Sequence, residues 1–267
     1  MAFEASGLEG CVALVTGVAG EIGSALGEAL LQAGASVAGI SRRRNSRQPG
    51  MAGRHEPKDR FLPIRADIRI EKDVRRAVAT ALDCFGKIDI LINNAGARGP
   101  TAPVTGISLK AWQEVLDTNL TGPFLLCREC LKPMMRQRQG CIINISSVAA
   151  HWAYPLRSPY AASKAGLINL TLTLAQEAGA ANIRVNAICP GPVAGEAIKG
   201  VLNTRAKALG ISTAEMERRF MRPSALVRMV STADINRIVL FLCSDAARNI
   251  TGQVIDVSAG YSLYLGV

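Results

Sequence analysis

The fold of this chain is decided by the stretch Val12–Thr16 (VALVT), which runs directly into Gly17–Gly23 (GVAGEIG). The first segment predicts a short buried strand, and the apolar spacing that begins near Ile22 predicts a helix. Glycines at such a junction let the backbone turn tightly and approach a diphosphate, which the N–H groups at the helix N-terminus bind. The strand before the turn and the helix after it therefore predict a nucleotide site more strongly than the glycines do alone.

Short β-branched segments alternate with longer helical patterns along the whole chain, and no internal repeat occurs. The expected strands are Val12–Thr16, Ser36–Ile40, Phe61–Ile64, Ile88–Asn93, Cys141–Ser146, Arg184–Cys189 and Val254–Val257. Helices are expected to begin near Ile22, Glu71, Leu109, Pro123, Ser158 and Thr232, with further helical sequence over Glu196–Met221. Crossovers of this length predict a parallel sheet with helices on both faces. The fold class is therefore α/β, with one domain over residues 1–267 built on a Rossmann-type, doubly wound sheet of about seven strands.

Two segments interrupt this alternation. Residues 41–60 contain Gly and Pro and few apolar side chains, which indicates an exposed loop after the second strand. Residues 196–228 form an insertion whose helical patterns break near Gly210 and Pro223. Because such sheets bind ligands beyond the carboxyl ends of their strands, we expect this insertion to be a lid over the substrate.

The chain is strongly basic, with 31 Lys and Arg against 21 Asp and Glu and a formal net charge of +10. Residues 41–60 contribute +5 and residues 196–228 contribute +4, so the excess lies beside the second strand and in the lid. A nucleic-acid-binding protein would use the basic run Arg42–Arg60, but aromatic residues make up only 4% of the chain and no nucleic-acid module accompanies the run. We therefore expect an acidic small ligand and no nucleic acid.

Histidine and cysteine contents limit the chemistry and the compartment. His55 and His151 are the only histidines, which excludes a His-rich metal site, and no metal is expected. The seven cysteines are scattered through mostly apolar segments, as in a protein of the reducing cytoplasm. No signal-peptide pattern and no run of about 18 uncharged apolar residues is present. The sequence therefore predicts a cytoplasmic protein without a membrane partner.

A catalytic pattern follows the fifth expected strand. Tyr160 and Lys164 are four residues apart at the start of a helical pattern. This spacing places both on one helix face, about 5 to 6 Å apart at Cβ, where an ammonium can stabilise a phenolate. Such pairs are common by chance, but Ser147 lies thirteen residues before Tyr160 at the end of the strand. The spacing of all three residues makes the pattern more specific than the Tyr–Lys pair alone.

These motifs resemble those of the short-chain dehydrogenase/reductase family, in its small single-domain branch, from Leu8 to about Gly260. The resemblance rests on the glycine turn, on residues 93–96 (Asn-Asn-Ala-Gly) after the fourth strand, on the Ser-Tyr-Lys pattern, and on the Pro190–Gly191 turn after the sixth. It implies interconversion of a ketone and a secondary alcohol by hydride transfer with a nicotinamide cofactor.

Near the C-terminus Val257-Ser258-Ala259-Gly260 replaces the more usual Asp-Gly-Gly of the family, and two further departures fall in the expected cofactor-binding turns. The branch usually has Thr-Gly-x-x-x-Gly-x-Gly, and Glu21 replaces its middle glycine. Read through Gly17, Gly20 and Gly23, the spacing resembles the larger branch that modifies sugar nucleotides, but the extra C-terminal domain of that branch is missing. We expect the Glu21 side chain to point away from a bound diphosphate. The usual Thr after the Pro-Gly turn is Gly195 here, so one contact to the nicotinamide amide or a phosphate is missing or comes from elsewhere.

The form of the cofactor is predicted by Ser41-Arg42-Arg43 after the second strand. NAD enzymes place an acid there for the ribose 2′-hydroxyl, whereas a 2′-phosphate requires a cation. Because Ser41 is neutral and two arginines follow, NADP(H) is the preferred cofactor, and NAD(H) stays open. The resemblance places Asp67 and Ile68 at the adenine. The other cofactor-binding positions that it implies are Gly17, Gly20, Glu21, Ile22, Gly23, Asn94, Ala95, Gly96, Tyr160, Lys164, Pro190, Gly191 and, at the nicotinamide amide, the backbone of Val193.

The resemblance also implies four catalytic roles. Tyr160 donates a proton to the carbonyl oxygen, and its pKa is expected to fall below about 10 because of the Lys164 charge. Ser147 hydrogen-bonds the same oxygen. Lys164 binds the nicotinamide ribose, and Asn119, the fourth member, holds a water that connects Lys164 to solvent.

The candidates for the substrate pocket lie near the catalytic residues and in the lid. They are Arg98, Ser147, His151, Trp152, Tyr154, Arg157 and Tyr160. His151 is expected to form a wall of the pocket, because Tyr160 already supplies the proton. The basic residues suit a small carbonyl or alcohol substrate that carries negative charge.

Two related functions remain open beside a broad ketone reductase. Arg138 resembles the carrier-docking arginine of 3-oxoacyl-(acyl-carrier-protein) reductases, whereas Ala181 stands where those enzymes have a second one. An NAD-dependent sugar or polyol dehydrogenase is the other alternative. The resemblance further implies a homo-oligomer, usually a tetramer and otherwise a dimer.

Overall fold

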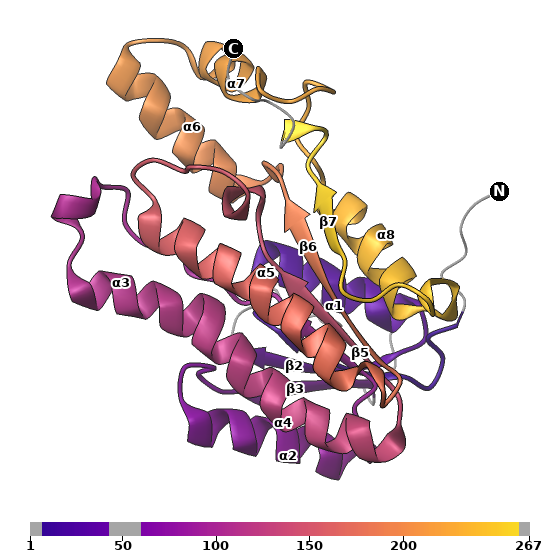
Figure 1. Ribbon diagram of the computed structural model, residues 1–267. Helices are drawn as coiled ribbons and strands as arrows, with labels where there is room; N and C mark the ends of the chain where they lie inside the picture. Colours follow the sequence, from indigo (N-terminus) through magenta and orange to yellow (C-terminus); the bar gives the residue numbers. More distant parts are fainter. Residues whose placement is uncertain (1–6, 43–59, 262–267) are drawn as a thin grey trace.

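The computed structural model describes residues 7–42 and 60–261, which form a twisted sheet flanked by helices (Figure 1). Seven strands make one sheet in the order β3-β2-β1-β4-β5-β6-β7, and each neighbouring pair is parallel. They are β1 (Val12–Thr16), β2 (Ser36–Ser41), β3 (Phe61–Arg65), β4 (Ile90–Asn93), β5 (Gly140–Ile145), β6 (Ile183–Pro190) and β7 (Val254–Val257). The predicted α/β class with a doubly wound sheet is confirmed.

The helices also begin close to their predicted positions. They are α1 (Glu21–Gln32), α2 (Glu71–Phe85), α3 (Leu109–Leu116), α4 (Gly122–Gln137), α5 (Ser158–Gly179), α6 (Glu196–Leu209), α7 (Thr213–Met221) and α8 (Thr232–Cys243). Short helical turns are η2 (Val104–Gly106), the π-helical η3 (Asp117–Thr121), η4 (Val148–Ala150) and η5 (Asp245–Ala247). The insertion expected to be a lid contains α6 and α7, and Gly210 ends α6 in the left-handed region with φ of 65°.

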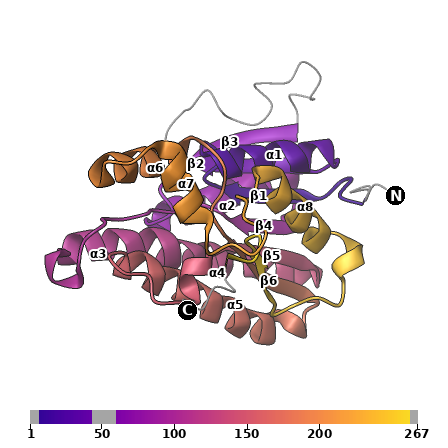
Figure 2. The same cartoon turned by 90° about the horizontal axis from the view of Figure 1, so that it is seen from above.

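Each face of the sheet has its own apolar core. The core on one face packs the strands against α2, α4 and α5, and the core on the other packs them against α1 and α8. Figure 2 shows α1 and α8 along one side of the sheet and α4 and α5 along the other. Burial on both faces explains why β1, β4 and β5 consist almost entirely of buried residues. Among the described residues, no helix is both long enough and apolar enough to cross a bilayer.

The connections reverse direction between β1 and β4. The chain passes from β1 outward to β3 and then crosses back to β4 on the other side of β1. Parallel α/β sheets bind ligands beyond the carboxyl ends of the strands at such a point. The α6–α7 segment lies beyond the same ends, at the top of Figure 1. The topology therefore directs the search for the site to this edge.

Candidate active site

The turn after β1 is closed by backbone hydrogen bonds. The Gly17 N–H donates to the Ile40 carbonyl at 2.8 Å, and the Gly20 N–H donates to the Gly17 carbonyl at 2.9 Å. Gly17 has φ of 73°, and a Cβ there would lie 2.9 Å from the Cα of Ala95. A Cβ at Gly23 would overlap the Gly17 carbonyl oxygen. The positive φ and the short distance to Ala95 require glycine at position 17, and the short distance to the Gly17 carbonyl oxygen requires glycine at position 23. The turn leads directly into the N-terminus of α1, which can bind an anion.

The segment after β4 fastens the glycine turn to the rest of the site. The backbone N–H groups of Asn94 and Ala95 both donate to Thr16 Oγ1 at 3.0 Å. The Asn94 side-chain amide donates to the Thr16 carbonyl at 2.9 Å. A Cβ on Gly96 would lie 3.5 Å from Oδ1 of Asn119. These residues therefore join the predicted cofactor turn to the predicted catalytic residues.

A cavity of about 290 Å³ lies beside the ends of β2 and β3, where a 2′-phosphate was predicted. It is lined by Arg42, Arg65, Ala66, Asp67, Asp73 and Arg76. Arg65 reaches it because it stands opposite Ser41 in the β2–β3 register. Three guanidinium groups face two carboxylates there, so the cavity carries net positive charge. Arg43, also predicted for this phosphate, falls outside the described residues.

Asp67 and Ile68 are each engaged with other parts of the protein. Arg69 donates to both carboxylate oxygens of Asp67, and this hydrogen bonding is the main reason why the Asp67 pKa is lowered. Ile68 is buried and packs against Gly122. The Ile68 side chain thus belongs to the core, and Asp67 is an ion-paired carboxylate in the cavity wall.

The four predicted catalytic residues meet at the carboxyl ends of β4 and β5. Tyr160 and Lys164 lie in the first turns of α5, with Lys164 Nζ 5.9 Å from the centre of the Tyr160 ring. Ser147 follows β5 and caps η4, and its hydroxyl accepts from the Ala149 N–H at 3.2 Å. Asn119 approaches from the π-helical turn η3, which connects α3 to α4. Strands and helices distant in sequence therefore bring all four into one place.

Asn119 links two of these elements through its side chain. Its Oδ1 accepts from the Ala97 N–H at 2.7 Å, and its Nδ2 donates to the Ala97 carbonyl at 2.9 Å and to Ser163 Oγ at 3.0 Å. The residue is fully buried. π-Helical turns of this kind are frequent at functional sites. Asn119 thus holds the segment after Gly96 against α5, and its predicted role in binding water stays a prediction.

Lys164 is a buried cation. Its side chain is only 4% exposed, and Nζ donates to the Ile145 carbonyl at 2.7 Å. Burial lowers the Lys164 pKa to about 8, and the nearby Cys189 acts in the opposite direction. The ammonium form therefore persists at neutral pH at a cost in desolvation.

Replacing Lys164 with Met should change how stability depends on pH. Below pH 8 Lys164 is charged in both the folded and the unfolded wild type, so folding has to bury the charge and the full desolvation cost reduces the free energy of unfolding. The cost disappears as pH rises from about 8 to 10.5, where both states become neutral. Urea unfolding at several pH values should show wild type gaining stability relative to K164M across this window. The exposed Lys110→Met variant should run parallel to wild type, and parallel behaviour of K164M would show that no charge is buried at 164.

Tyr160 has a raised pKa, mainly because of burial, while hydrogen bonding with Ser147 lowers it. Lys164 does not lower the Tyr160 pKa as expected, because its ammonium is directed to the Ile145 carbonyl. The phenol is consequently protonated at neutral pH. This is the form that a proton donor to a carbonyl oxygen needs.

A second cavity, of about 300 Å³, separates the loop after η4 from α7. It is lined by Tyr154, Pro155, Arg157, Met216, Arg219, Phe220, Pro223 and Tyr261. Tyr154 and Arg157 were predicted for the substrate pocket and lie in this cavity. The other residues predicted for the pocket are absent from its lining, namely Arg98, Ser147, His151, Trp152 and Tyr160. The insertion 196–228 thus forms the wall opposite Tyr154.

Arg157 connects this cavity to Tyr160. Its guanidinium lies 5.5 Å from the centre of the Tyr160 ring. It donates to the Arg98 carbonyl at 2.9 Å and to Thr101 Oγ1 at 3.2 Å, and its buried Nε has no partner. Within residues 7–42 and 60–261, no carboxylate forms an ion pair with Arg157. Its charge therefore remains available to a ligand in the cavity.

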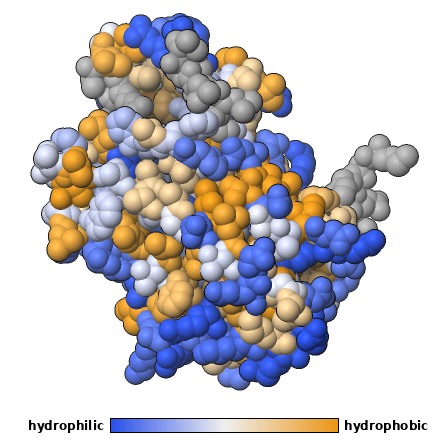
Figure 3. All heavy atoms as spheres, in the orientation of Figure 1, coloured by the Kyte–Doolittle hydropathy of each residue, from blue (hydrophilic) through white to orange (hydrophobic). Residues whose placement is uncertain are grey.

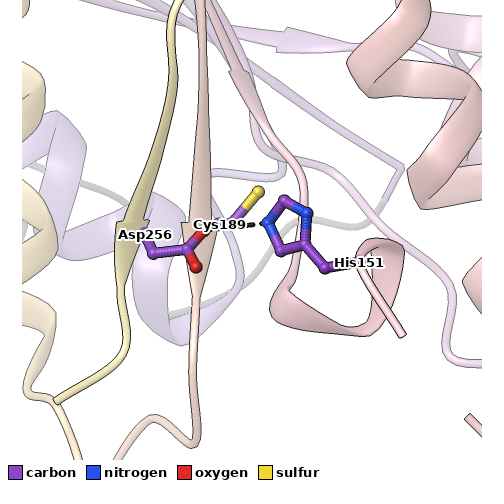
Figure 4. A group of neighbouring side chains, drawn as sticks. All are labelled: His151, Cys189 and Asp256. Atoms are coloured by element: carbon purple, nitrogen blue, oxygen red, sulfur yellow. Dashed lines mark hydrogen bonds and ion pairs between the residues drawn. The ribbon is translucent and has the colours of Figure 1, made fainter. Parts of the chain in front are cut away.

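His151 lies beside β6 and β7. Figure 4 shows its ring directed at Asp256, and Nε2 and Oδ1 are 2.9 Å apart. The Cys189 thiol is close by, and the donor atoms of the three residues lie within 4.8 Å of one another, as metal ligands do. Burial, however, raises the Cys189 pKa to about 11, and a metal needs the thiolate. We interpret the His151–Asp256 pair as a tie between η4 and β7.

The Pro190–Gly191 turn is fixed on both sides. The Gly191 N–H donates to the Val257 carbonyl at 2.9 Å, and a Cβ on Gly191 would lie 2.8 Å from Ser258 Cα. Val193 pairs with Val230 in an isolated parallel bridge. The backbone that was predicted to meet the nicotinamide amide is therefore held in place by the segment that follows residues 196–228.

Several residues that line these cavities carry little signal in the sequence. Arg65 and Arg76 belong to a strand and a helix whose sequences carry no motif, and only the register opposite Ser41 brings Arg65 to the site. Met216, Arg219 and Phe220 have the spacing of one helix face, which could have marked α7 as a wall of the pocket.

Comparison with known proteins gives the following relatives. Residues 17–262 match the family described as enoyl-(acyl carrier protein) reductase. The 3-oxoacyl-(acyl-carrier-protein) reductase of Aquifex aeolicus is 34% identical over 256 residues, which cover 95% of this chain and 98% of that protein. The enzyme of the same name from Thermotoga maritima is 32% identical over 259 residues, with 95% and 98% coverage.

Solved structures resemble the chain over almost its whole length. An NAD⁺-bound xylitol dehydrogenase superposes with a TM-score of 0.85 at 28% identity, covering 95% of this chain and 99% of that one. A levodione reductase superposes with a TM-score of 0.86 at 27% identity, covering 96% and 99%. The two names describe a dehydrogenase and a reductase.

Proposed function

This chain belongs to the short-chain dehydrogenase/reductase family, and from that premise we propose that it is an NADP(H)-dependent reductase of a ketone that carries negative charge. As a member of the family it is an oxidoreductase that uses a nicotinamide cofactor on CH–OH groups. The observation that carries the proposal is the meeting of Ser147, Tyr160, Lys164 and Asn119 near the glycine turn. Arg157, beside the Tyr160 ring, lines one cavity, and Arg42, after β2, lines another.

The residues present fit a dinucleotide. Any side chain at position 17 would overlap Ala95, so only glycine leaves space for a ligand at this turn. The positive N-terminus of α1 begins directly behind it and would bind the diphosphate. The nicotinamide ring supplies or accepts the hydride when it is bound. Lys164, buried next to the ends of β5 and α5, would hold the nicotinamide ribose.

Proton transfer would be carried out by Tyr160. Its phenol is protonated at neutral pH and would donate to the carbonyl oxygen as negative charge develops there. Ser147, which shares a hydrogen bond with the phenol, would donate to the same oxygen. Asn119 would keep this arrangement in place by its bonds to Ala97 and Ser163.

The preference for NADP(H) is supported by the cavity beside β2. Arg42 was expected to bind the 2′-phosphate, and Arg65 adds a further cation at the same cavity, whereas Arg76 already pairs with Asp73 at 2.9 Å. Planar guanidinium groups pair well with phosphate oxygens. The preference is opposite to the cofactor named for the xylitol dehydrogenase.

Negative charge on the substrate is supported by Arg157 in the cavity under the lid. Arg219 lines the same cavity, but Glu215 already accepts from its Nε at 2.8 Å. Arg157 donates only to neutral groups among the described residues. A carboxylate or phosphate on the substrate would complete the bonding of the Arg157 guanidinium.

Replacing Arg157 with Met should discriminate between charged and neutral substrates. We expect kcat/KM for an anionic keto acid to fall by about tenfold or more, because a charge-assisted hydrogen bond is lost. For a neutral ketone of equal size the fall should be markedly smaller. The R219M variant should affect both substrates little, since Glu215 already pairs with that charge. An equal loss on both substrates in R157M would assign Arg157 to the support of Tyr160 alone.

Reduction of 3-oxoacyl thioesters on acyl carrier protein is the second candidate, favoured by the names of the bacterial relatives. Arg138, the candidate docking residue, donates to the Ala180 carbonyl at 3.1 Å. It lies between α4 and β5, at the amino ends of the strands, whereas Tyr160 stands near the carboxyl ends. The absence of a basic residue at Ala181 favours the small ketone.

The test is an NADPH-oxidation screen over keto acids, keto-esters, keto-sugars and acyl-carrier thioesters, each repeated with NADH. We expect the highest kcat/KM for an anionic small ketone with NADPH. A clear preference for acyl-carrier thioesters would support the second candidate. If no carbonyl compound is reduced and NADPH fluorescence does not respond to the protein, the proposal fails.

We also infer a cytoplasmic homo-oligomer. All seven cysteines are free, which suits a reducing compartment. Phe124 and Met135 on α4 and Leu172 on α5 are large apolar side chains on the outside of the molecule. Figure 3 shows hydrophobic residues gathered across the middle of this face, below the α6–α7 segment. Association through these helices would cover them.

A further inference from the structure

Two departures from the family pattern, Glu21 and Gly195, contact each other in the fold. Glu21 is the first residue of α1, and Gly195 directly precedes the first residue of α6. A Cβ placed on Gly195 would overlap both carboxylate oxygens of Glu21. The Glu21 carboxylate therefore occupies the space that a side chain at position 195 would take.

The contact with Glu21, and not the backbone conformation, disfavours a side chain at position 195. Its φ of 161° is extended, a conformation that any residue adopts. The obstacle to a larger residue is the end of a flexible side chain, which can move. A substitution at 195 should consequently displace the carboxylate without disrupting the fold.

The carboxylate lies between the N-termini of two helices. Neither α1 nor α6 has a side-chain hydrogen bond at its N-cap. Lys199 in the first turn of α6 has a raised pKa, chiefly through its hydrogen bond with Glu196, and the charge of Glu21 adds to this effect. The positive ends of both helices favour a carboxylate here.

The chemistry of a carboxylate limits which part of a dinucleotide it can contact. A hydroxyl, as on the Thr that the family pattern has at 195, donates and accepts, whereas an ionised carboxylate only accepts. A diphosphate also only accepts and is negative, so it repels Glu21. The nicotinamide carboxamide has N–H groups that donate, and it is expected at Val193, two residues before Gly195.

We propose that Glu21 accepts a hydrogen bond from the carboxamide N–H of the nicotinamide, and so replaces the side chain that is missing at Gly195. This inference rests on the proposed dinucleotide site. Glu21 is thus a binding residue that orients the ring, and its negative charge weakens the binding of the diphosphate. Glu21 also explains the glycine at position 195, because a side chain there would occupy the same space as the Glu21 carboxylate.

The experiment compares NADP⁺ with its 3-acetylpyridine analogue, in which a methyl group replaces the amide nitrogen. Calorimetric titration gives Kd for each ligand without any turnover. For wild type we expect NADP⁺ to bind about tenfold more tightly than the analogue, the effect of one charge-assisted hydrogen bond. In the Glu21→Ala variant the ratio should fall to near one.

Three further variants separate position from charge. Gly195→Ala keeps Glu21 but displaces its carboxylate, so the ratio should also fall toward one. Glu21→Gln keeps an acceptor oxygen without the charge, and it should retain a several-fold ratio while both ligands bind more tightly. Glu28→Ala removes the same charge two turns along α1 and should leave the wild-type ratio unchanged.

An unchanged ratio in Glu21→Ala and Gly195→Ala, with both ligands still bound, would overturn this inference and leave the proposed function intact. The absence of any NADP⁺ binding by wild type would instead overturn the proposed function. Melting temperatures of the variants, measured in parallel, establish that each is folded.

Discussion

Replacing Tyr160 with Phe is expected to lower kcat for ketone reduction by about a thousandfold, because a positioned proton donor contributes an effect of this size. The substitution removes only the hydroxyl. The ring on which the Arg157 guanidinium stacks at 5.5 Å is retained, so the loop and α5 should keep their places. Steady-state NADPH oxidation measures the loss, and fluorescence titration of NADPH should give a Kd close to that of wild type.

The pair of measurements distinguishes a chemical role of Tyr160 from a structural one. Retained turnover would remove Tyr160 from the proton transfer. A parallel loss of NADPH affinity would mean that the phenol contributes to the cofactor site. The prediction therefore requires that kcat falls while Kd stays constant.

Replacing Ser41 with Asp should shift cofactor preference from NADPH toward NADH by about a hundredfold in the ratio of kcat/KM values. Ser41 ends β2 and stands opposite Arg65, at the cavity that holds Arg42 and Arg76. A carboxylate there repels a 2′-phosphate and accepts a hydrogen bond from a 2′-hydroxyl. Kinetics with both cofactors give the ratio directly.

A matched control adds the same charge elsewhere. Ser108 caps α3, where its hydroxyl accepts from the Ala111 N–H at 3.2 Å, and Asp caps a helix equally well. The S108D variant should keep the wild-type ratio. If wild type already prefers NADH, the assignment of Arg42 and Arg65 to a 2′-phosphate is wrong.

The strands and helices were predictable because their signals are local. β1 and β7 have the predicted bounds, and the other strands differ by no more than two residues at either end. The break expected near Gly210 is the end of α6, at a residue with positive φ. Apolar runs, periodic patterns and glycines act over a few residues, so a single sequence already contains these signals.

The side-chain environments were not predictable in the same way. Lys164 was expected to lower the Tyr160 pKa, but its ammonium donates to the Ile145 carbonyl and burial dominates the phenol. His151 was expected in the pocket wall, yet it pairs with Asp256 from β7. Both outcomes depend on atoms of other strands. Spacing within one helix places two Cβ atoms, but it does not orient the long side chains that follow.

The sequence alone determined the fold class, the glycine turn and the identity of the Ser147, Tyr160 and Lys164 set, because each is written in short segments with strict spacing. Only the tertiary structure decided what surrounds them. The strand register brought Arg65 opposite Ser41, and the packing of the 196–228 insertion placed α7 across a cavity from Arg157. Glu21 and Gly195, which look like separate departures from the family pattern in the sequence, contact each other in the fold between the starts of α1 and α6. Contacts of this kind join residues far apart along the chain, and they arise only when packing of the whole sheet brings those residues together.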